Sequence, residues 1–336
     1  MKTNILKMKK YIPILLIFGI VAVLSTNCDK NINEEYFRTN KGLLIGEYLK
    51  AHSDTFGEFY KLLEKTKSVS FLNAYGIYTC FAPSNNAMKE FYQSKGKTSI
   101  DDFSTADDLD YLKQIVRYHL VGDTIATSMF TNGGLRDTTL SGDYLITSFD
   151  TGGLKTIKVN GIANVFLKDV NLVNGIVHGI DKVLNPVTLS VAKFIETDGK
   201  YNIFSEALKN TGLYDSLNIR SFRVTVFAET DSVFALDSIF SYSDLLKKYS
   251  QTGEPYLNPK DSLYLWIAYH CIHQTLFLTD LANVTYNNMT NSMLSTVTKK
   301  ADILLNESPV NVQLSNNPTK NGVVHTLKKA LTFVAV

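Results

Sequence analysis

The histidines are the residues of this sequence best suited to acid–base or metal chemistry. Six occur, at positions 52, 119, 178, 270, 273 and 325. His178 lies in "NGIVHGIDKVL" (174–184), and His325 lies 147 positions later in "NGVVHTLKKAL" (321–331). His119 and His270 each follow a tyrosine. A histidine repeated at matching places indicates either a duplicated site or a duplicated structural element.

The spacing around these histidines favours a structural role. Three apolar residues precede His119 at helical spacing, and three precede His270 in the same way. They are Leu112, Ile115 and Val116 for the first, and Leu263, Trp266 and Ile267 for the second. Each imidazole therefore falls on an apolar helix face, where a neutral ring needs a hydrogen-bond partner. His178 and His325 lie in apolar strands, and we predict that they tie those strands to a neighbouring loop.

Metal binding is not favoured by the spacing. A metal site needs three or four ligands, including at least one well-spaced pair. His270 and His273 are such a pair, but Gly122 stands at the place of His273 in the other copy. We therefore predict no metal and no cofactor. The sequence also has no Gly-rich phosphate loop, GxSxG elbow or HExxH motif, which argues against an enzyme.

The chain contains one unit twice. Four landmarks recur in the same order with offsets of 146 to 151 residues. They are "FGEFYKLLEK" and "FSEALKNTGL", "YTCFAPSNNAMKEF" and "VTVFAETDSVFAL", the two Tyr-His pairs, and the two closing phrases quoted above. We place the first copy at 39–187 and the second at 188–336.

Each copy shows helical periodicity first and strand alternation later, which predicts an α+β fold. In the first copy we expect a strand that ends at Pro83, followed by a helix capped by Ser84; Thr230 is the corresponding cap in the second copy. We further expect the Asn160–Gly161 and Asn174–Gly175 pairs to form tight turns with positive φ at both residues.

The segments "TCFAPSNNAM", "YHLVGD" and "NGIVHGIDKVLNP" resemble the fasciclin family. The resemblance implies two tandem domains, each a β-wedge of two sheets with packed helices. It also implies adhesion or extracellular binding without catalysis. The motif residues are Phe81, Pro83, His119, Asn174, Gly175 and His178 in the first copy, and Phe227, His270, Asn321, Gly322 and His325 in the second. The second copy departs from the pattern at two positions: Glu229 corresponds to Pro83 of the first copy, and Lys328 corresponds to Asp181.

The resemblance also nominates binding residues. In animal members of the family the Tyr-His segment is associated with integrin binding, which points to Tyr118, His119, Tyr269 and His270. The helical spacing instead places these histidines toward a core, so exposed surfaces of the first copy are the alternative.

The first 27 residues read as an export signal. Lysines open the chain, and an apolar run of 14 residues follows at 11–24, shorter than a membrane span. Cys28 then resembles the lipidated cysteine of bacterial lipoproteins, although Asn27 and Ser25 depart from that pattern. Cleavage by an ordinary signal peptidase is the alternative. Residues 28–38 would form a tether, and Cys80 and Cys271 stand at non-equivalent positions and predict no disulfide.

Composition agrees with a globular protein. The 336 residues are 45% hydrophobic and 20% charged, enough for about two domains. The net charge of +2 and the absence of a basic block after the first ten residues argue against nucleic acid as a partner.

The sequence as a whole indicates a non-catalytic lipoprotein of the cell envelope. Lipid on Cys28 would hold it to the outer membrane of a diderm bacterium, on the cell surface or the periplasmic face, where it binds an extracellular protein or a glycan. One alternative is a structural spacer in an outer-membrane complex. Another is a metal-dependent hydrolase that uses His178, or His270 with His273.

Overall fold

The computed structural model describes residues 42–73, 76–299 and 302–333. The expected export signal, Cys28, the tether 28–38 and residues 39–41 of the first copy lie outside the described residues. The described residues from Leu43 onward form one compact unit. None of the helices in the described residues combines the length and the apolar character that a membrane crossing needs.

The first copy begins with helices and ends with strands, as the sequence indicated. Its helices are α3 (Ile45–Ala51), α4 (Ser53–Lys65), α5 (Val69–Leu72), α6 (Asn85–Ser94) and α7 (Ala106–Tyr118). Its strands are β1 (Tyr78–Pro83), β2 (Leu120–Val121), β3 (Gly133–Gly134), β4 (Ile146–Phe149), β5 (Ile157–Val159), β6 (Ala163–Leu172) and β7 (Gly175–Ile180).

The second copy repeats this order. Its helices are α8 (Val191–Thr197), α9 (Asn202–Thr211), α10 (Leu213–Ser216), α11 (Asp231–Leu236), α12 (Tyr242–Tyr249) and α13 (Ser262–Tyr269). Its strands are β8 (Val224–Ala228), β9 (Cys271–Ile272), β10 (Thr285–Asn287), β11 (Met293–Lys299), β12 (Asp302–Leu305), β13 (Ser308–Asn311), β14 (Asn317–Thr319) and β15 (Gly322–Leu327).

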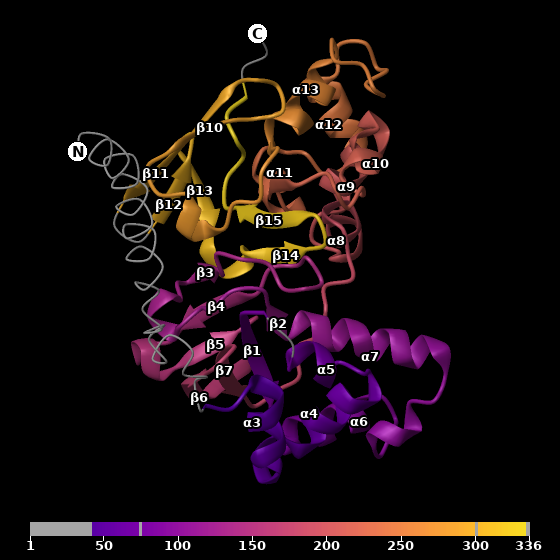
Figure 1. Cartoon of the computed structure of the whole chain (residues 1–336). Coiled ribbons are helices and arrows are strands. Elements are labelled where there is room, and N and C mark those ends of the chain that lie inside the picture. Colours follow the sequence, from indigo (N-terminus) through magenta and orange to yellow (C-terminus); the bar gives the residue numbers. More distant parts are fainter. Residues whose placement is uncertain (1–41, 74–75, 300–301, 334–336) are drawn as a thin grey trace, which may run out of the picture. The chain divides into compact units, whose positions relative to one another are not determined.

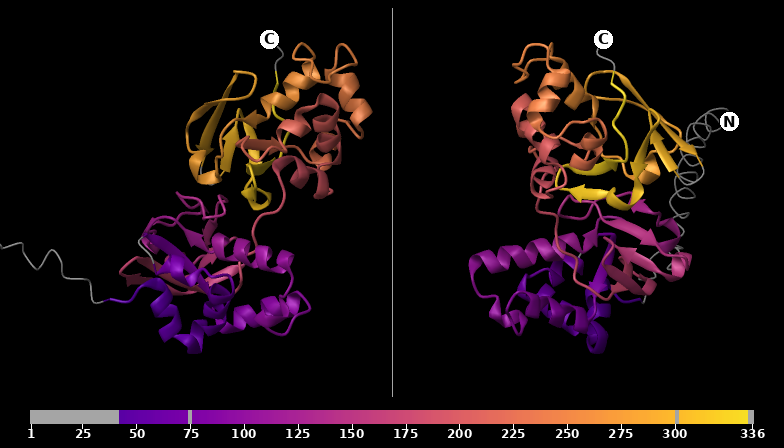
Figure 2. Two further views of the ribbon diagram at one scale, coloured as in Figure 1. Left: turned by 45° about the vertical axis from the view of Figure 1, so that its right-hand side comes forward. Right: turned by 180° about the vertical axis from the view of Figure 1, so that it is seen from behind.

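In each copy the helices gather on one side and the strands on the other (Figure 1, Figure 2). The strand order is β2-β1-β7-β6-β5-β4-β3 in the first copy and β10-β11-β12-β13-β15-β8-β9 in the second, with β14 beside β15. The expected pair of sheets is thus one hydrogen-bonded path. It bends in the first copy at β6, which pairs with both β5 and β7 and carries two register shifts. Such irregularities curl a sheet, and the curl gives the wedge.

Strand alternation divides each copy into two cores. In β1, Cys80 and Ala82 join the cluster formed with the helices, whereas Phe81 points into the cluster between the two halves of the curled sheet. In β8, Val226 and Phe227 divide in the same way. The central strands β1 and β8 are therefore buried on both faces, which explains their continuous apolar runs.

The predicted helix caps are confirmed. β1 ends at Pro83, and the Ser84 hydroxyl accepts a hydrogen bond from the Ala87 amide at 3.2 Å. The Thr230 hydroxyl caps α11 through the Val233 amide at 3.4 Å. Each cap satisfies a backbone donor that the first turn of a helix leaves open.

The prediction of positive φ at both residues holds for one of the two Asn-Gly pairs. Asn160 and Gly161 both have positive φ, 51° and 69°, as expected of a tight hairpin turn. At the other pair a turn is present, but Val173 and Asn174 form it between β6 and β7, and Gly175 is already the first residue of β7. Only Gly175 has positive φ, 142°, so the prediction of positive φ at both residues is wrong for Asn174–Gly175. The reason is that this pair serves long-range packing, as the next subsection describes.

Candidate functional site

The asparagine of the Asn-Gly motif links the start and the end of each copy through hydrogen bonds. In the first copy the side chain of Asn174 accepts a hydrogen bond from the Ile45 amide at 2.9 Å and donates one to the Leu72 carbonyl at 2.6 Å. The backbone carbonyl of Asn174 accepts a hydrogen bond from the Tyr78 amide at 3.0 Å. One buried asparagine thus fixes the start of α3, the end of α5 and the start of β1 against β7.

Asn321 makes the equivalent contacts in the second copy. Its side chain accepts a hydrogen bond from the Val191 amide at 2.8 Å and donates to the Leu217 and Ile219 carbonyls at 2.8 and 3.1 Å. Its carbonyl accepts the Val224 amide at 3.0 Å. The same residue type therefore recurs because the same four segments must be joined.

The glycine of the phrase is required by close approach of two backbones. A Cβ on Gly175 would lie 1.8 Å from the carbonyl oxygen of Tyr78, and a Cβ on Gly322 would lie 1.7 Å from that of Val224. Strands β7 and β15 begin at these glycines and run parallel to β1 and β8. Only glycine allows the parallel pairs to start there.

His178 and His325 tie their strands to a neighbouring loop, as predicted. The Nε2 of His178 lies 2.9 Å from the Ile125 carbonyl, and the Nε2 of His325 lies 2.7 Å from the Leu276 carbonyl. In both rings Nδ1 accepts a backbone amide at 3.2 Å, from Asp169 and Asn316 respectively. These partners define a neutral ring with the proton on Nε2.

Burial keeps these rings neutral. Loss of hydration lowers the pKa of His178, and it lowers the pKa of His325 to about 4. Across the parallel ladder His178 pairs with Phe81 and His325 with Phe227, with ring centroids 5.3 Å apart in both cases. Two landmarks that lie about 100 residues apart in each copy are thus direct neighbours in the sheet.

His119 joins the end of α7 to β1 and to the segment that follows β7. Its Nδ1 donates to the Ile115 carbonyl at 2.7 Å, and its Nε2 accepts the Leu184 amide at 3.0 Å. Its own carbonyl accepts the Phe81 amide at 2.9 Å. The ring is fully buried, and desolvation lowers the pKa of His119 to about 4. The helical-face prediction for this residue is confirmed.

His270 is equally buried but has a different partner. Its Nδ1 lies 2.7 Å from the Trp266 carbonyl, and its Nε2 lies 3.1 Å from Oε1 of Glu229. That carboxylate also accepts the Leu331 amide at 2.7 Å. Glu229 therefore stands between the histidine and the backbone amide that contact each other directly in the first copy. The sequence showed Glu229 as a departure from the pattern but not as the partner of His270.

The tyrosines of the Tyr-His segments bind asparagines in β-turns. The hydroxyl of Tyr118 accepts a hydrogen bond from Nδ2 of Asn160 at 2.9 Å, and that of Tyr269 accepts one from Nδ2 of Asn306 at 2.7 Å. Desolvation raises the pKa of Tyr118. The sequence gave no signal for either pairing, since each joins residues about 40 positions apart.

The four nominated binding residues are buried. Exposed fractions are zero for Tyr118, His119 and His270 and 8% for Tyr269. A partner cannot touch these side chains in this conformation, so their assignment as direct contacts is corrected. The physical reason is the helical spacing that turns the end of α7 and α13 into the core.

The histidine pair considered for a metal does not converge. His273 is exposed and its ring packs on Phe222 at 4.3 Å, whereas His270 is buried against Glu229. Within the described residues, no group of three or more His, Cys, Asp or Glu side chains has the arrangement of a metal site. Cys80 and Cys271 are free and buried, and desolvation raises the pKa of Cys271 to about 12.

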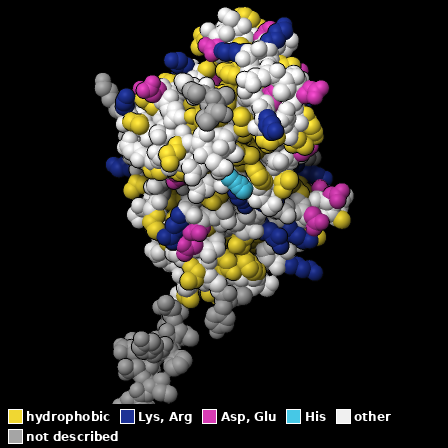
Figure 3. Space-filling view, turned by 90° about the horizontal axis from the view of Figure 1, so that it is seen from above, with side chains coloured by type: hydrophobic (Ala, Val, Ile, Leu, Met, Phe, Trp, Pro, Cys, Tyr) yellow, Lys and Arg dark blue, Asp and Glu magenta, His cyan; other side chains and the backbone are white. Residues whose placement is uncertain are grey.

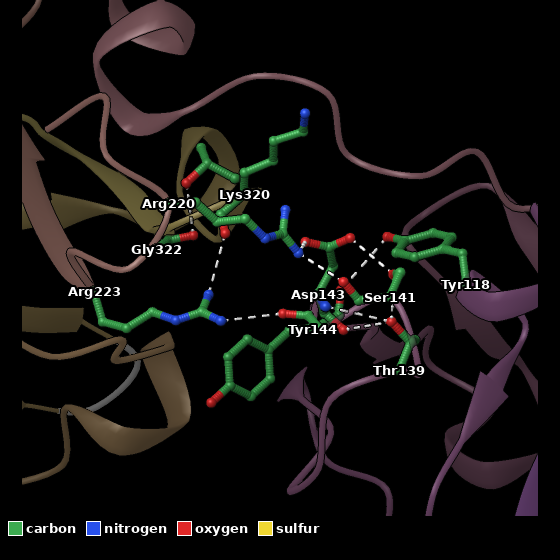
Figure 4. A network of polar contacts seen from close by, with 11 residues as sticks. Tyr118, Thr139, Ser141, Asp143, Tyr144, Arg220, Arg223, Lys320 and Gly322 are labelled. Carbon is green, nitrogen blue, oxygen red and sulfur yellow. Dashed lines mark hydrogen bonds and ion pairs between the residues drawn. The ribbon is translucent and has the colours of Figure 1, made fainter. Parts of the chain in front are cut away.

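Polar contacts join the two copies. The Nη2 of Arg220 donates to the Ser141 carbonyl at 2.6 Å and to Oδ1 of Asp143 at 3.0 Å (Figure 4). The guanidinium of Arg223 donates to the Lys320 carbonyl at 3.1 Å and to the Gly142 carbonyl at 3.2 Å. Two arginines of the second copy therefore fix the 141–143 loop of the first.

A small apolar contact lies beside these arginines. Ile146, Phe277 and Val323 form a buried cluster, against which Tyr144 packs with its ring 5.3 Å from that of Phe277. The polar network also borders an open cleft of about 710 Å³, lined by residues of both copies. On the face seen from above in Figure 3, acidic, basic and apolar side chains are intermixed without a field of one sign.

Comparison with known proteins agrees with this architecture. The profile of the fasciclin domain family matches residues 54–186 and 199–333. The chain belongs to the fasciclin family and carries two fasciclin domains in tandem.

Individual relatives are 26% to 29% identical to the chain over the aligned residues. Human periostin is 26% identical over 238 residues, which cover 67% of this chain and 27% of periostin. Protein sll1483 of Synechocystis sp. is 28% identical over 148 residues, 44% of this chain and 76% of that protein. Mouse stabilin-1 is 29% identical over 147 residues, 43% of this chain and 5% of stabilin-1. The chain thus matches only about a quarter of periostin's length.

Among solved structures, the chain is similar to a fasciclin domain pair from the insect cell adhesion molecule fasciclin I. That match has 18% sequence identity and a TM-score of 0.34, and it covers 82% of this chain and 96% of the other.

Proposed function

We propose that this protein is a non-catalytic binding protein of the bacterial cell envelope that engages an extracellular protein or a glycan. The observation that carries the proposal is the use made of the repeated histidines. All four are buried, and their ring nitrogens are bonded to the backbone or, at His270, also to Glu229. The groups best suited to acid–base chemistry therefore hold the fold together, and the outer surface is left for recognition.

The placement in the envelope is supported by the sequence. Residues 1–27 have the pattern of an export signal, and Cys28 follows as the residue to be lipidated. Lipid at Cys28 would tether both domains to the outer membrane, at the cell surface or on its periplasmic face. The 28–38 segment would then separate the domains from the lipid.

The test combines localisation with binding. Intact cells that express the full chain are treated with protease, and the purified full chain is probed on arrays of matrix proteins and of glycans. We expect proteolytic release of the domains, loss of membrane association in Cys28→Ala, and binding to at least one array component. A chain that binds nothing on either array and co-purifies with outer-membrane proteins would instead support the structural spacer.

The hydrolase alternative makes a different prediction. If His178 served catalysis, His178→Ala would remove an activity and leave the melting temperature unchanged. The contacts of His178 to the Ile125 and Asp169 backbone predict the reverse, a lower melting temperature.

A further inference from the structure

The cleft between the two domains is built from both copies of the repeat. In the first domain its walls come from the end of α6, the exposed side of α7 and the 140–143 loop. The linker 185–188 also lines it, and Arg220 and Lys320 line it from the second domain. Its volume of about 710 Å³ falls within the range of small-ligand sites.

The charges in this cleft are unbalanced. Four cations line it, Lys95, Arg117, Arg220 and Lys320, against the single carboxylate of Asp143. That carboxylate is already bonded to Arg220 at 3.0 Å and to the Ser141 hydroxyl at 2.8 Å. Among the described residues, Lys95, Arg117 and Lys320 form no ion pair. Three positive charges therefore face the cleft without a counter-charge, which favours an anionic ligand.

The backbone that carries two of these cations, Arg117 and Lys320, is held in place. Arg117 lies in the last turn of α7. The Lys320 carbonyl accepts a hydrogen bond from the Arg223 guanidinium, and the Lys320 amide donates one to the Leu189 carbonyl at 2.9 Å. Arg223 and Arg220 hold the 141–143 loop at the same time (Figure 4). The backbone around the cleft therefore loses little conformational entropy when a ligand binds.

The neutral lining fits a saccharide better than a peptide. Gln114, Asn185 and Thr188 offer amide and hydroxyl groups that can exchange hydrogen bonds with sugar hydroxyls. Leu140, Pro186 and Val187 add an apolar surface for the C–H faces of a sugar ring. All the lining residues lie in helices, loops or turns, so a peptide finds no strand edge here to extend.

We propose that the interdomain cleft binds an acidic saccharide, one that carries carboxylate or sulfate groups. This inference rests on the proposed binding function and names its site and ligand class. The anionic groups meet Lys95, Arg117 and Lys320, and the hydroxyls meet the amide side chains of the lining. Because both domains supply cations, one ligand contacts both copies of the repeat.

The experiment measures binding of three oligosaccharides to the full chain purified in detergent. The probes are a heparin hexasaccharide for sulfate, a galacturonic acid hexamer for carboxylate, and maltohexaose as the uncharged reference. The cleft variant combines Arg117→Gln with Lys320→Gln. The control combines Lys155→Gln with Lys247→Gln, which removes the same charge, one residue per domain, from exposed positions outside the cleft.

We expect at least one acidic hexamer to bind and maltohexaose not to bind. The cleft variant should bind the acidic hexamer about tenfold more weakly or worse, and the control within about twofold of the parent. Raising the salt from about 50 to about 300 mM should weaken binding by the parent. An unchanged melting temperature of both variants excludes a folding defect.

Several results would overturn the inference. The inference fails if neither acidic hexamer binds, or if maltohexaose binds as well as they do. It also fails if the cleft variant and the control are weakened equally, or if a glutamate hexamer binds more tightly than either acidic saccharide. If the arrays detect a ligand that the cleft variant binds as well as the parent, the proposed binding function stands and the cleft assignment fails.

Discussion

Oε1 of Glu229 lies between Nε2 of His270, at 3.1 Å, and the Leu331 amide, at 2.7 Å. In the first domain no carboxylate intervenes, and the Leu184 amide donates directly to His119 at 3.0 Å. The other ring nitrogen is held alike in both domains, because Nδ1 of His270 lies 2.7 Å from the Trp266 carbonyl and Nδ1 of His119 lies 2.7 Å from the Ile115 carbonyl. The equivalent histidines of the two domains thus have different partners at Nε2, a backbone amide in the first domain and a carboxylate in the second.

Removing the Glu229 carboxylate should destabilise the second domain. Glu229→Ala leaves Nε2 of His270 and the Leu331 amide without a partner in a buried site, and we expect a loss of about 3 kcal/mol in unfolding free energy. Glu229→Gln keeps one acceptor and should lose less. Trp266, the single tryptophan, is buried in the second domain, so denaturant unfolding followed by its fluorescence measures this domain.

The matched control is Glu254→Ala, at an exposed glutamate of the same domain, with an expected change within about 0.5 kcal/mol. A loss in Glu229→Ala no larger than in this control would contradict the bridging role of Glu229.

The glycine of the closing phrase should not tolerate a side chain. In Gly322→Ala the new Cβ would lie 1.7 Å from the Val224 carbonyl oxygen, and backbone cannot move aside without breaking the β8–β15 pairing. We expect a loss of about 4 kcal/mol or more, seen in tryptophan fluorescence as unfolding at lower denaturant. Gly253→Ala, at a φ of 73° with nothing within 4 Å, should cost only about 1 to 2 kcal/mol. Equal losses would refute the close-approach argument.

The Asn321 side chain should be needed for its contacts on both sides. Asn321→Ala removes the acceptor for the Val191 amide and the donor to the Leu217 carbonyl, and we expect a loss of about 2 to 4 kcal/mol. Asn321→Asp keeps the acceptor but cannot donate, so it should also be destabilised. Asn287→Ala, at an exposed position in β10, is the control; a comparable loss there would argue against the joining role of Asn321.

The buried histidines should make the protein sensitive to mild acid. Burial lowers the pKa of His119 and of His325 to about 4 from an ordinary value of 6.5. Below pH 6.5 the unfolded chain gains protons that the folded chain refuses, so this stability is complete above about pH 6.5 and is lost as the pH falls toward 4. The loss at pH 5 is about 2 kcal/mol for each histidine.

The measurement is the denaturant midpoint between pH 7 and pH 5. His325→Gln should be less stable than the parent at pH 7, but the second domain should lose about 2 kcal/mol less than in the parent when the pH falls to 5. An identical pH dependence of parent and variant would show that His325 does not titrate as its burial requires.

The amino-acid sequence alone determined the features that follow from local periodicity. Helical spacing placed His119 and His270 on buried faces, the caps at Ser84 and Thr230 followed from residue type, and the repeated phrases showed two copies of one α+β unit. These signals are readable because helix and strand periods, and the chemistry of a helix start, involve residues close in sequence.

Only the tertiary structure decided which distant groups meet. Asn174 and Asn321 lie in turns, and their side chains also join segments about 100 or more residues away, which the sequence did not indicate. Glu229 proved to be the partner of His270, and the cations of Arg117 and Lys320 converged on one cleft from different domains. Such contacts are fixed by how the curled sheets and helices pack, and no spacing along a single chain encodes them.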